Sequence, residues 1–339
     1  MNKYILAGGA LSLSLLGCEV VSKLVDTGEL FSLGVIPAQG FADVNSPNYG
    51  AVKIFLGKDG GMNSALGMLE IESDSSVVTL EEVDDIKGNQ QGDLLVLVDG
   101  SGSLEQIGCE ICPSDPLRYR VAAVKELTQS LHDCAADWRI GLMEFGPRAS
   151  DEFSRTYVLT DYTVKTEAIL ESADGLTSEG GTPLWDSLVE TLHSMDDSIQ
   201  ENYSTLSLDQ FGKGIIIVSD GKDTESYSVV EDVIDLASEL QIPISAVGLG
   251  GSSDVSDGFS VSAVDELRDL AEKTGGFYAS VSSPIELPEL SSKIASAYCG
   301  GYSEAHARFL TPPVSGEIVS GVIRLKNSGF STPFSFRAP

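Results

Sequence analysis

The feature that most constrains the fold is a repeated alternation of apolar runs and amphipathic stretches between residues 93 and 299. The clearest apolar run, Leu94 to Val98, predicts a strand buried on both faces. Strands are expected at 93–98, 139–145, 155–159, 214–219, 243–248 and 277–281. Helices are expected at about 116–134 (with Asp115 as its cap), at about 162–173, after Thr182, from Val230 to Leu240, from Val264 to Ala271 and at about 285–298. This order predicts an α/β fold with a doubly wound, mostly parallel six-stranded sheet covered by helices on both faces.

The residues on either side of this region follow a different pattern. Short alternating runs separated by turn clusters occupy residues 31–88, and the same pattern returns after residue 302. Neither flank holds more than about four strands, which is marginal for a separate sheet with its own core. We therefore expect the flanks, 31–88 and 302–339, to form one β-sandwich into which an α/β domain at 90–301 is inserted. The alternative is two unrelated β segments that each pack on the central domain.

Polar residues that suit a hard cation stand close to three of the expected elements. The three pieces are Asp99-Gly100-Ser101-Gly102-Ser103, Gly180-Gly181-Thr182-Pro183 and Ser219-Asp220-Gly221. In an open α/β sheet, ligands bind beyond the carboxyl ends of the strands, so the three pieces can converge on one edge. Carboxylates and hydroxyls are oxygen ligands, the kind that magnesium and calcium take.

Together the three pieces resemble the metal-ion-dependent adhesion site of von Willebrand factor A (vWA) domains, and residues from about 90 to 300 resemble such a domain as a whole. The resemblance implies that the hydroxyls of Ser101, Ser103 and Thr182 coordinate a divalent cation, Mg²⁺ or else Mn²⁺ or Ca²⁺. It also implies that Asp99 and Asp220 act partly through water. Neutral hydroxyls leave the ion short of negative charge, so an Asp or Glu carboxylate of a protein partner can replace a water. The expected function is metal-dependent protein binding or adhesion.

The residues around the first piece and after the third leave alternatives open. Glu105 and Asp223 can tune the site, but a solvated loop acid is the simpler interpretation of each. The segment from Leu104 to Ser114 departs from the family pattern, in which the first helix follows within a few residues. It is either part of the ligand surface or an insertion without functional consequence. Binding residues concentrate on loops held by a rigid scaffold, which favours the first interpretation.

The N-terminus carries a targeting signal. An apolar stretch of thirteen residues, from Tyr4 to Leu16, is too short to span a bilayer comfortably. It ends in Leu15-Leu16-Gly17-Cys18, which resembles the bacterial lipobox, so residues 1–18 are expected to be a lipoprotein signal peptide with lipid attached at Cys18. Residues 19–30 then form a tether, and a lipid anchor holds the protein at the outer membrane of a bacterial envelope, facing periplasm or surface. Secretion with a spare cysteine is the alternative.

Export implies an oxidising compartment, in which the four remaining cysteines can pair. A helix over 116–134 spans about 27 Å, so Cys134 at its end lies too far from Cys109 and Cys112 to bond with either. The expected pairs are Cys109–Cys112 and Cys134–Cys299. A zinc site or a redox-active pair at Cys109 and Cys112 is the alternative, but zinc needs two further ligands that no second cysteine pair or nearby histidine supplies.

Charge and motif chemistry argue against two other classes of function. The formal charge is −30, from 51 acidic and 21 basic residues, whereas nucleic-acid binding needs a basic face. An enzyme is not expected, because the motif at Asp99 lacks the first glycine of the Gly-x-Ser-x-Gly turn of serine hydrolases. An aspartyl phosphohydrolase would need a second acid two residues after Asp99, where Ser101 stands. His132, His193 and His306 fall in expected helices or the tail. The remaining alternative is a structural envelope lipoprotein with a vestigial metal site.

Overall fold

The α/β unit is built on one central sheet. The computed structural model describes residues 30–36, 49–56, 69–73, 78–105, 113–147, 155–203, 211–220, 223–249, 263–281, 283–309, 318–325 and 331–337. The sheet has six strands in the order β10-β9-β8-β5-β6-β7. They are β5 (Gln91–Asp99), β6 (Asp137–Phe145), β7 (Thr156–Thr163), β8 (Gly212–Ser219), β9 (Ile244–Leu249) and β10 (Tyr278–Val281). β7 pairs antiparallel with β6 and the other four pairings are parallel, so the mostly parallel sheet that the sequence predicted is confirmed.

Burial on both faces explains the apolar run of β5. The side chains from Leu94 to Val98 have no exposed surface. They alternate between two cores: Leu94, Val96 and Val98 pack on one face of the sheet, and Leu95 and Leu97 on the other. A strand in this position has no solvent-facing side, so the residues from Leu94 to Val98 are all apolar.

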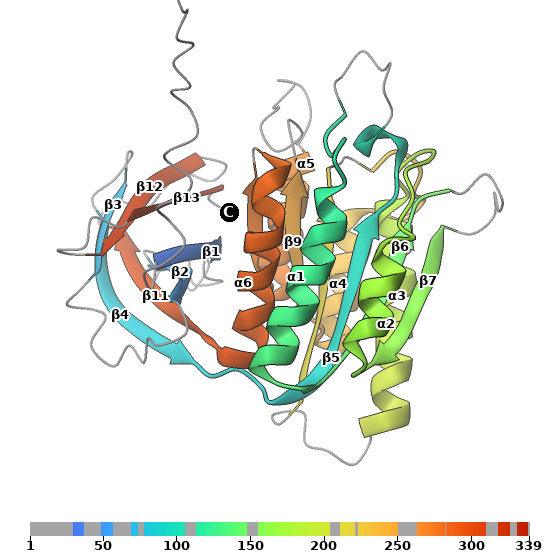
Figure 1. Ribbon diagram of the computed structural model, residues 1–339. Helices are drawn as coiled ribbons and strands as arrows, with labels where there is room; N and C mark the ends of the chain where they lie inside the picture. Colours follow the sequence, from blue (N-terminus) through green and yellow to red (C-terminus); the bar gives the residue numbers. More distant parts are fainter. Residues whose placement is uncertain are drawn as a thin grey trace, which may run out of the picture.

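Six α-helices cover the two faces of the sheet in the described part of the chain (Figure 1). The first core includes side chains of α1 (Tyr119–Cys134), α2 (Thr166–Ala173) and α6 (Leu287–Gly300). The second includes side chains of α3 (Leu184–Tyr203), α4 (Val230–Leu240) and α5 (Ala263–Thr274). The doubly wound arrangement is therefore confirmed. None of the helices described here combines the length and the apolar character needed to cross a bilayer.

Helix α1 begins later than the sequence pattern predicts. It starts at Tyr119, because Arg118 adopts the left-handed conformation with φ 58°. Leu117, which lies within the helix expected over about 116–134, precedes α1 and is 73% exposed. Asp115 nevertheless accepts hydrogen bonds from the backbone N–H groups of Tyr119 (2.6 Å) and Arg120 (3.1 Å). The acid caps the helix from one turn further away than the capping rule assumes.

The flanking segments form two further sheets, and each sheet combines N-terminal and C-terminal strands. The strands are β1 (Leu30–Ile36), β2 (Tyr49–Leu56), β3 (Leu69–Ser73), β4 (Val78–Ile86), β11 (Tyr302–Phe309), β12 (Ile318–Leu325) and β13 (Ser331–Arg337). Their orders are β1-β2-β11-β4 and β13-β12-β3. β11 lies between β2 and β4, and β12 pairs with β3. The two flanks therefore pair with each other, beside the α/β unit on the side of α6 (Figure 1).

Candidate metal centre

The carboxyl ends of two neighbouring strands bring the predicted acids to one edge of the sheet. Asp99 is the last residue of β5 and Asp220 directly follows β8, the parallel neighbour of β5. The backbone N–H of Gly102 donates to the carbonyl oxygen of Gly180 (3.0 Å), which joins the first piece of the motif to the second. Gly180 has φ 65°, a conformation that favours glycine. These contacts place all three pieces on the same rim.

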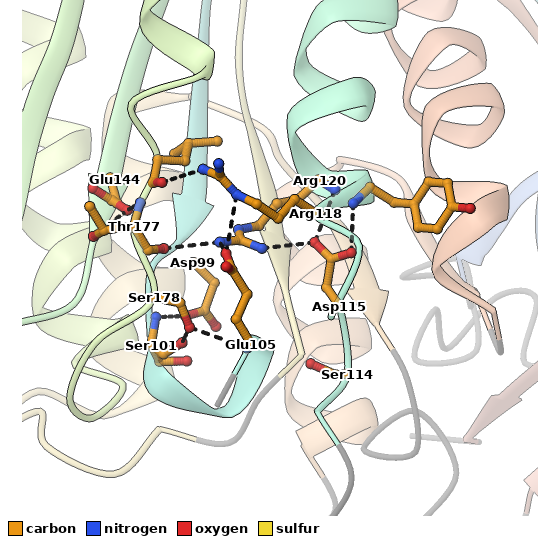
Figure 2. Close-up of polar contacts among 12 residues, drawn as sticks. Asp99, Ser101, Glu105, Ser114, Asp115, Arg118, Arg120, Glu144, Thr177 and Ser178 are labelled. Atoms are coloured by element: carbon orange, nitrogen blue, oxygen red, sulfur yellow. Dashed lines mark hydrogen bonds and ion pairs between the residues drawn. The ribbon is translucent and has the colours of Figure 1, made fainter. Parts of the chain in front are cut away.

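Four of the five predicted site residues form a continuous set of contacts on this rim. The Ser101 and Ser103 hydroxyl oxygens lie 3.0 Å apart, and Ser103 donates to Oδ1 of Asp220 (3.0 Å). Oδ1 of Asp99 accepts a hydrogen bond from the backbone N–H of Ser101 (2.7 Å; Figure 2). Oδ2 of Asp99 accepts one from the Ser219 hydroxyl (2.6 Å). Each carboxylate is thus oriented by hydroxyl or amide donors.

Thr182, the fifth predicted residue, is held on the rim through its backbone. Its N–H donates to the Thr224 hydroxyl (2.9 Å), and its carbonyl accepts from the Thr224 N–H (2.9 Å). The residue is buried, with 6% of its surface exposed. No contact between described residues links the Thr182 side chain to the other four members of the site.

Burial dominates the electrostatics of the two acids. Asp99 has no exposed surface. Burial and, second, the charge of Asp220 raise the pKa of Asp99 to about 6, against the opposing hydrogen bonds from Ser101 and Ser219. Burial also raises the pKa of Asp220, although the hydroxyls of Ser114 and Ser103 oppose the shift. A cation placed between or beside two buried carboxylates stabilises them, because it offsets their mutual repulsion.

The donor set fits a hard divalent cation. Ser101, Ser103 and Thr182 offer neutral hydroxyls and the two acids offer carboxylates, so all five side chains present oxygen. Ser103 is exposed while Ser101 is buried, which leaves the set reachable from solvent on one side. Within the described ranges, no group of three or more His, Cys, Asp or Glu residues is close enough to hold an ion. A metal at this rim therefore depends on the serine and threonine hydroxyls.

A buried ion cluster lies next to the rim and was not foreseen from the sequence (Figure 2). Arg120 has no exposed surface; it donates to Asp115 (2.9 Å), to the Thr177 carbonyl (3.0 Å) and to Glu105. Arg118 also pairs with Glu105, at 3.3 Å. Glu105 is therefore part of an ion network, and its interpretation as a solvated acid is wrong. An arginine beside an amphipathic stripe gives no sequence signal that it points inward.

A second buried acid supports the glycine turn after β5. Oε1 of Glu144 accepts a hydrogen bond from the Thr177 hydroxyl (2.9 Å) and one from the Thr177 backbone N–H. A Cβ on Gly100 would lie 2.6 Å from the same oxygen. Glycine at this position is thus required by close approach to the acid. The apolar surroundings of Glu144 in the sequence could have marked it as a buried polar residue.

Asp223 stabilises a helix end. Its Oδ2 accepts a hydrogen bond from the backbone N–H of Trp185 (3.1 Å), in the first turn of α3, and its Oδ1 accepts one from the N–H of Ser226 (3.0 Å). The acid therefore fixes the loop after β8 against the helix that follows Thr182. This role is structural, and the interpretation of Asp223 as a solvated loop acid is also wrong.

One of the two expected disulfides is present in the described region. Cys134 and Cys299 are bonded, with their Cα atoms 6.0 Å apart. The bridge joins the C-terminal ends of α1 and α6, which run side by side (Figure 1). It lies at the opposite end of α1 from the metal rim. Cys109, Cys112 and Cys18, the expected lipidation site, lie outside the described residues.

Several solved structures resemble the chain. The pilus adhesin SpaC from Lactobacillus rhamnosus GG is 12% identical, with 88% of this chain and 49% of that chain covered and a TM-score of 0.44. The vWF domain of the type V pili tip protein Mfa5 from Porphyromonas gingivalis is 13% identical, with 63% and 95% covered and a TM-score of 0.41. The PilB minor pilin from Streptococcus sanguinis is 15% identical, with 63% and 62% covered and a TM-score of 0.42.

The chain thus spans about half the length of the SpaC structure. No curated protein sequence gives a significant match. The model of the von Willebrand factor type A domain family matches residues 93–293, which is more than half of the 339 residues. Those residues include all of the six-stranded sheet except the first two residues of β5, the covering helices up to the middle of α6, and the rim described above. The protein belongs to the von Willebrand factor type A domain family.

Proposed function

We propose that the protein is a divalent-cation-dependent protein-binding or adhesion module. The observation that carries this proposal is the set of contacts that runs from Ser101 through Ser103 to Asp220, beside the fully buried Asp99. Such a set combines hydroxyl ligands with two acids that are short of positive charge. The arrangement supports recognition, because its hydroxyl and carboxylate oxygens form a ligand set for a cation, and the exposed Ser103 leaves that set reachable from solvent.

Each residue has a distinct role in this proposal. The hydroxyls of Ser101, Ser103 and Thr182 would hold the cation, Mg²⁺ or else Mn²⁺ or Ca²⁺. Asp99 and Asp220 would orient those hydroxyls and bind through water. A bound cation supplies a Lewis-acidic position for an Asp or Glu carboxylate of the partner. The chain provides neutral ligands next to the ion, so the partner's charge is the one that completes the site.

The cellular setting is also part of the proposal. We propose a lipid-anchored protein of the bacterial envelope, with a signal peptide at 1–18 and lipid at Cys18, and with a second disulfide between Cys109 and Cys112. The vWA domain would be inserted at 90–301 in a β-sandwich formed by 31–88 and 302–339. Pairing of β11 with β2 and β4, and of β12 with β3, supports this organisation.

The direct test measures cation binding to the purified protein. Mn²⁺ and Mg²⁺ are titrated into the wild type, into Asp220→Ala and into Asp174→Ala as a control. Asp174 is an exposed acid that pairs with Lys125 (2.8 Å) away from the site. Saturable binding by the wild type and the control, but not by Asp220→Ala, is expected. No occupancy by either ion in the wild type would contradict the proposal.

A second experiment tests the recognition step. Immobilised protein is incubated with envelope extract, with and without chelator, and the capture is repeated with Asp220→Ala. A partner that is lost in both conditions is the expected result. A partner retained in both would leave a structural envelope lipoprotein with a vestigial site as the better description. That alternative is favoured by one observation: both carboxylate oxygens of Asp220 already accept hydroxyl hydrogen bonds.

A further inference from the structure

We propose that Ser114 is a positioning residue of the metal centre, an inference that rests on the proposed function. Ser114 lies eleven residues after Ser103 and outside all three pieces of the sequence motif. Its hydroxyl donates a hydrogen bond to Oδ2 of Asp220, while Ser103 donates to Oδ1 of the same carboxylate (3.0 Å). The two serines therefore hold Asp220 from both sides.

The backbone fixes Ser114 in this position. Its N–H donates to the carbonyl of Ser103 (3.2 Å), and the N–H of Asp115 donates to the carbonyl of Leu104 (2.8 Å). Asp115 is in turn bonded to the buried Arg120 (2.9 Å) and has no exposed surface. Two backbone hydrogen bonds and the buried Asp115–Arg120 ion pair thus hold the residue on either side of the Ser114 hydroxyl in place. Its placement is predetermined by rigid surroundings.

The chemistry of the contact explains what Ser114 contributes. Asp220 is 7% exposed, so an unpaired carboxylate oxygen there would lose hydration without compensation. Ser114 supplies a donor to Oδ2, which fixes the rotation of the carboxylate group. Oδ1 then faces Ser103 and keeps that hydroxyl oriented with its lone pairs available to a cation. Partners that orient a metal ligand in this way commonly affect affinity by about 10-fold or more when removed.

Ser114 also gives the segment between Leu104 and the first helix a place in the site. Glu105, before the undescribed residues 106–112, bonds Arg120, and Ser114, after them, bonds Asp220. Figure 2 shows Glu105 next to Arg118 and Arg120, and Ser114 next to Asp115. One end of the insertion is therefore fixed to Asp220, and the other to the ion cluster beside the rim.

The test compares Mn²⁺ affinity among four forms of the purified protein: wild type, Ser114→Ala, Ser114→Thr and Ser130→Ala. Ser130 is the control, because it is also a partly buried serine that makes one side-chain hydrogen bond. Its hydroxyl bonds that of Ser292 (2.5 Å) between α1 and α6, whose C-terminal ends the disulfide joins away from the rim. We expect about 10-fold weaker binding in Ser114→Ala, recovery to within about twofold in Ser114→Thr, and no change in Ser130→Ala.

Unfolding in the presence of chelator separates a positioning role from a structural one. Both variants should stay folded without cation, and Ser114→Ala should lose more stability than Ser130→Ala, because Ser114 donates to a buried carboxylate whereas Ser130 bonds a neutral hydroxyl. Weaker Mn²⁺ binding by a variant that is folded in chelator then reports positioning of the site and not loss of the fold. Equal Mn²⁺ affinity in wild type and Ser114→Ala would overturn the inference and leave the proposed function standing. Absence of Mn²⁺ binding in the wild type would overturn both.

Discussion

Strand β5 carries a buried aspartate at each end, and the two are neutralised in different ways. Asp93, near its start, and Asp99, at its end, both have no exposed surface. Both carboxylate oxygens of Asp93 are bonded by Arg139, through Nε (2.8 Å) and Nη2 (2.5 Å). Among the residues that the structure describes, no lysine or arginine forms an ion pair with Asp99. Its partners are the Ser101 amide and the Ser219 hydroxyl.

This difference supports the proposed cation site at the end of β5 that holds Asp99. A buried carboxylate is tolerated when it is paired and hydrogen-bonded. The chain supplies the positive charge for Asp93 itself, from Arg139 on the adjacent strand β6. It supplies only neutral donors to Asp99, and it places Asp220 nearby with the same sign of charge. Under the proposed function, a bound cation would supply the positive charge that the described residues do not supply to Asp99.

The largest expected effect on stability comes from removing Arg139, the positive partner of Asp93. Arg139→Met keeps most of the side-chain volume but leaves Asp93 buried without its positive partner. We expect a loss of about 3–5 kcal/mol in the free energy of unfolding at pH 7. The measurement is urea or guanidinium denaturation of the purified protein.

The double variant Asp93→Asn/Arg139→Met provides the control for this prediction. Removing both charges should recover most of the lost stability, because no uncompensated ion then remains. A double variant as unstable as Arg139→Met alone would show that packing of the arginine stem, against the rings of Tyr162 and Tyr203, matters more than its charge.

The second prediction compares the same substitution, aspartate to asparagine, at the two ends of β5. Asp99→Asn is nearly isosteric and should weaken Mn²⁺ binding at least about 100-fold, which corresponds to about 2.7 kcal/mol. Asp93→Asn should leave the Mn²⁺ affinity within about twofold of the wild type, because Asp93 lies at the opposite end of β5. Calorimetric titration of the two variants checks both values. Equal losses of affinity would mean that the effect reports general destabilisation instead of a site.

The two ends of β5 also differ in how far the sequence predicts them. Asp99 is recognisable because glycine and serine follow it in a motif, and the fold places strand ends on one rim. Asp93 precedes an apolar run without any motif, and nothing in the sequence pairs it with Arg139. The pairing depends on the register of β5 with β6, in which Asp93 lies opposite Arg139. Such a contact depends on tertiary structure.

The same contrast holds for the fold as a whole. Strands and helices of the α/β unit follow from periodicity, and their observed bounds differ from the expected ones by a few residues. The expected start of α1 was wrong because Arg118 adopts the left-handed conformation, and Asp115 caps the helix from a position that its bond to the buried Arg120 fixes. Ser114 was absent from the expected site for a similar reason: its role depends on the chain returning to the rim after residues 106–112. Sequence patterns such as helix caps and short motifs cannot predict contacts that depend on the tertiary fold.

The third prediction concerns pH in the presence of chelator. The pKa of Asp99 is raised from 3.8 to about 6, so the folded protein holds this proton more tightly than the unfolded chain. The stability of the cation-free protein should therefore fall as pH rises from about 4 to about 6, by an amount on the order of 2 kcal/mol. Denaturation curves of wild type and Asp99→Asn over this range isolate the contribution of Asp99. A difference that does not change with pH would contradict the prediction.

The smallest expected effects come from removing one hydroxyl that bonds the aspartate at each end of β5. Ser219→Ala removes a 2.6 Å hydrogen bond to Asp99 and leaves the Ser101 amide as its remaining donor, so we expect a loss of about 1.5 kcal/mol at pH 7 in chelator. Tyr203→Phe removes a 3.4 Å contact to Asp93, which is longer than a good hydroxyl hydrogen bond.

The phenylalanine ring in Tyr203→Phe would still lie against Arg139, whose guanidinium carbon is 4.9 Å from the centre of the tyrosine ring. Asp93 also keeps Arg139 and the Ser198 hydroxyl (3.2 Å), so the expected loss is below about 0.5 kcal/mol. Denaturation of the two variants measures the difference. A neutral hydrogen-bond donor should stabilise Asp99 more than Asp93, because Arg139 already supplies a positive charge to Asp93. A larger loss of stability in Tyr203→Phe than in Ser219→Ala would contradict the comparison that supports the proposed cation site.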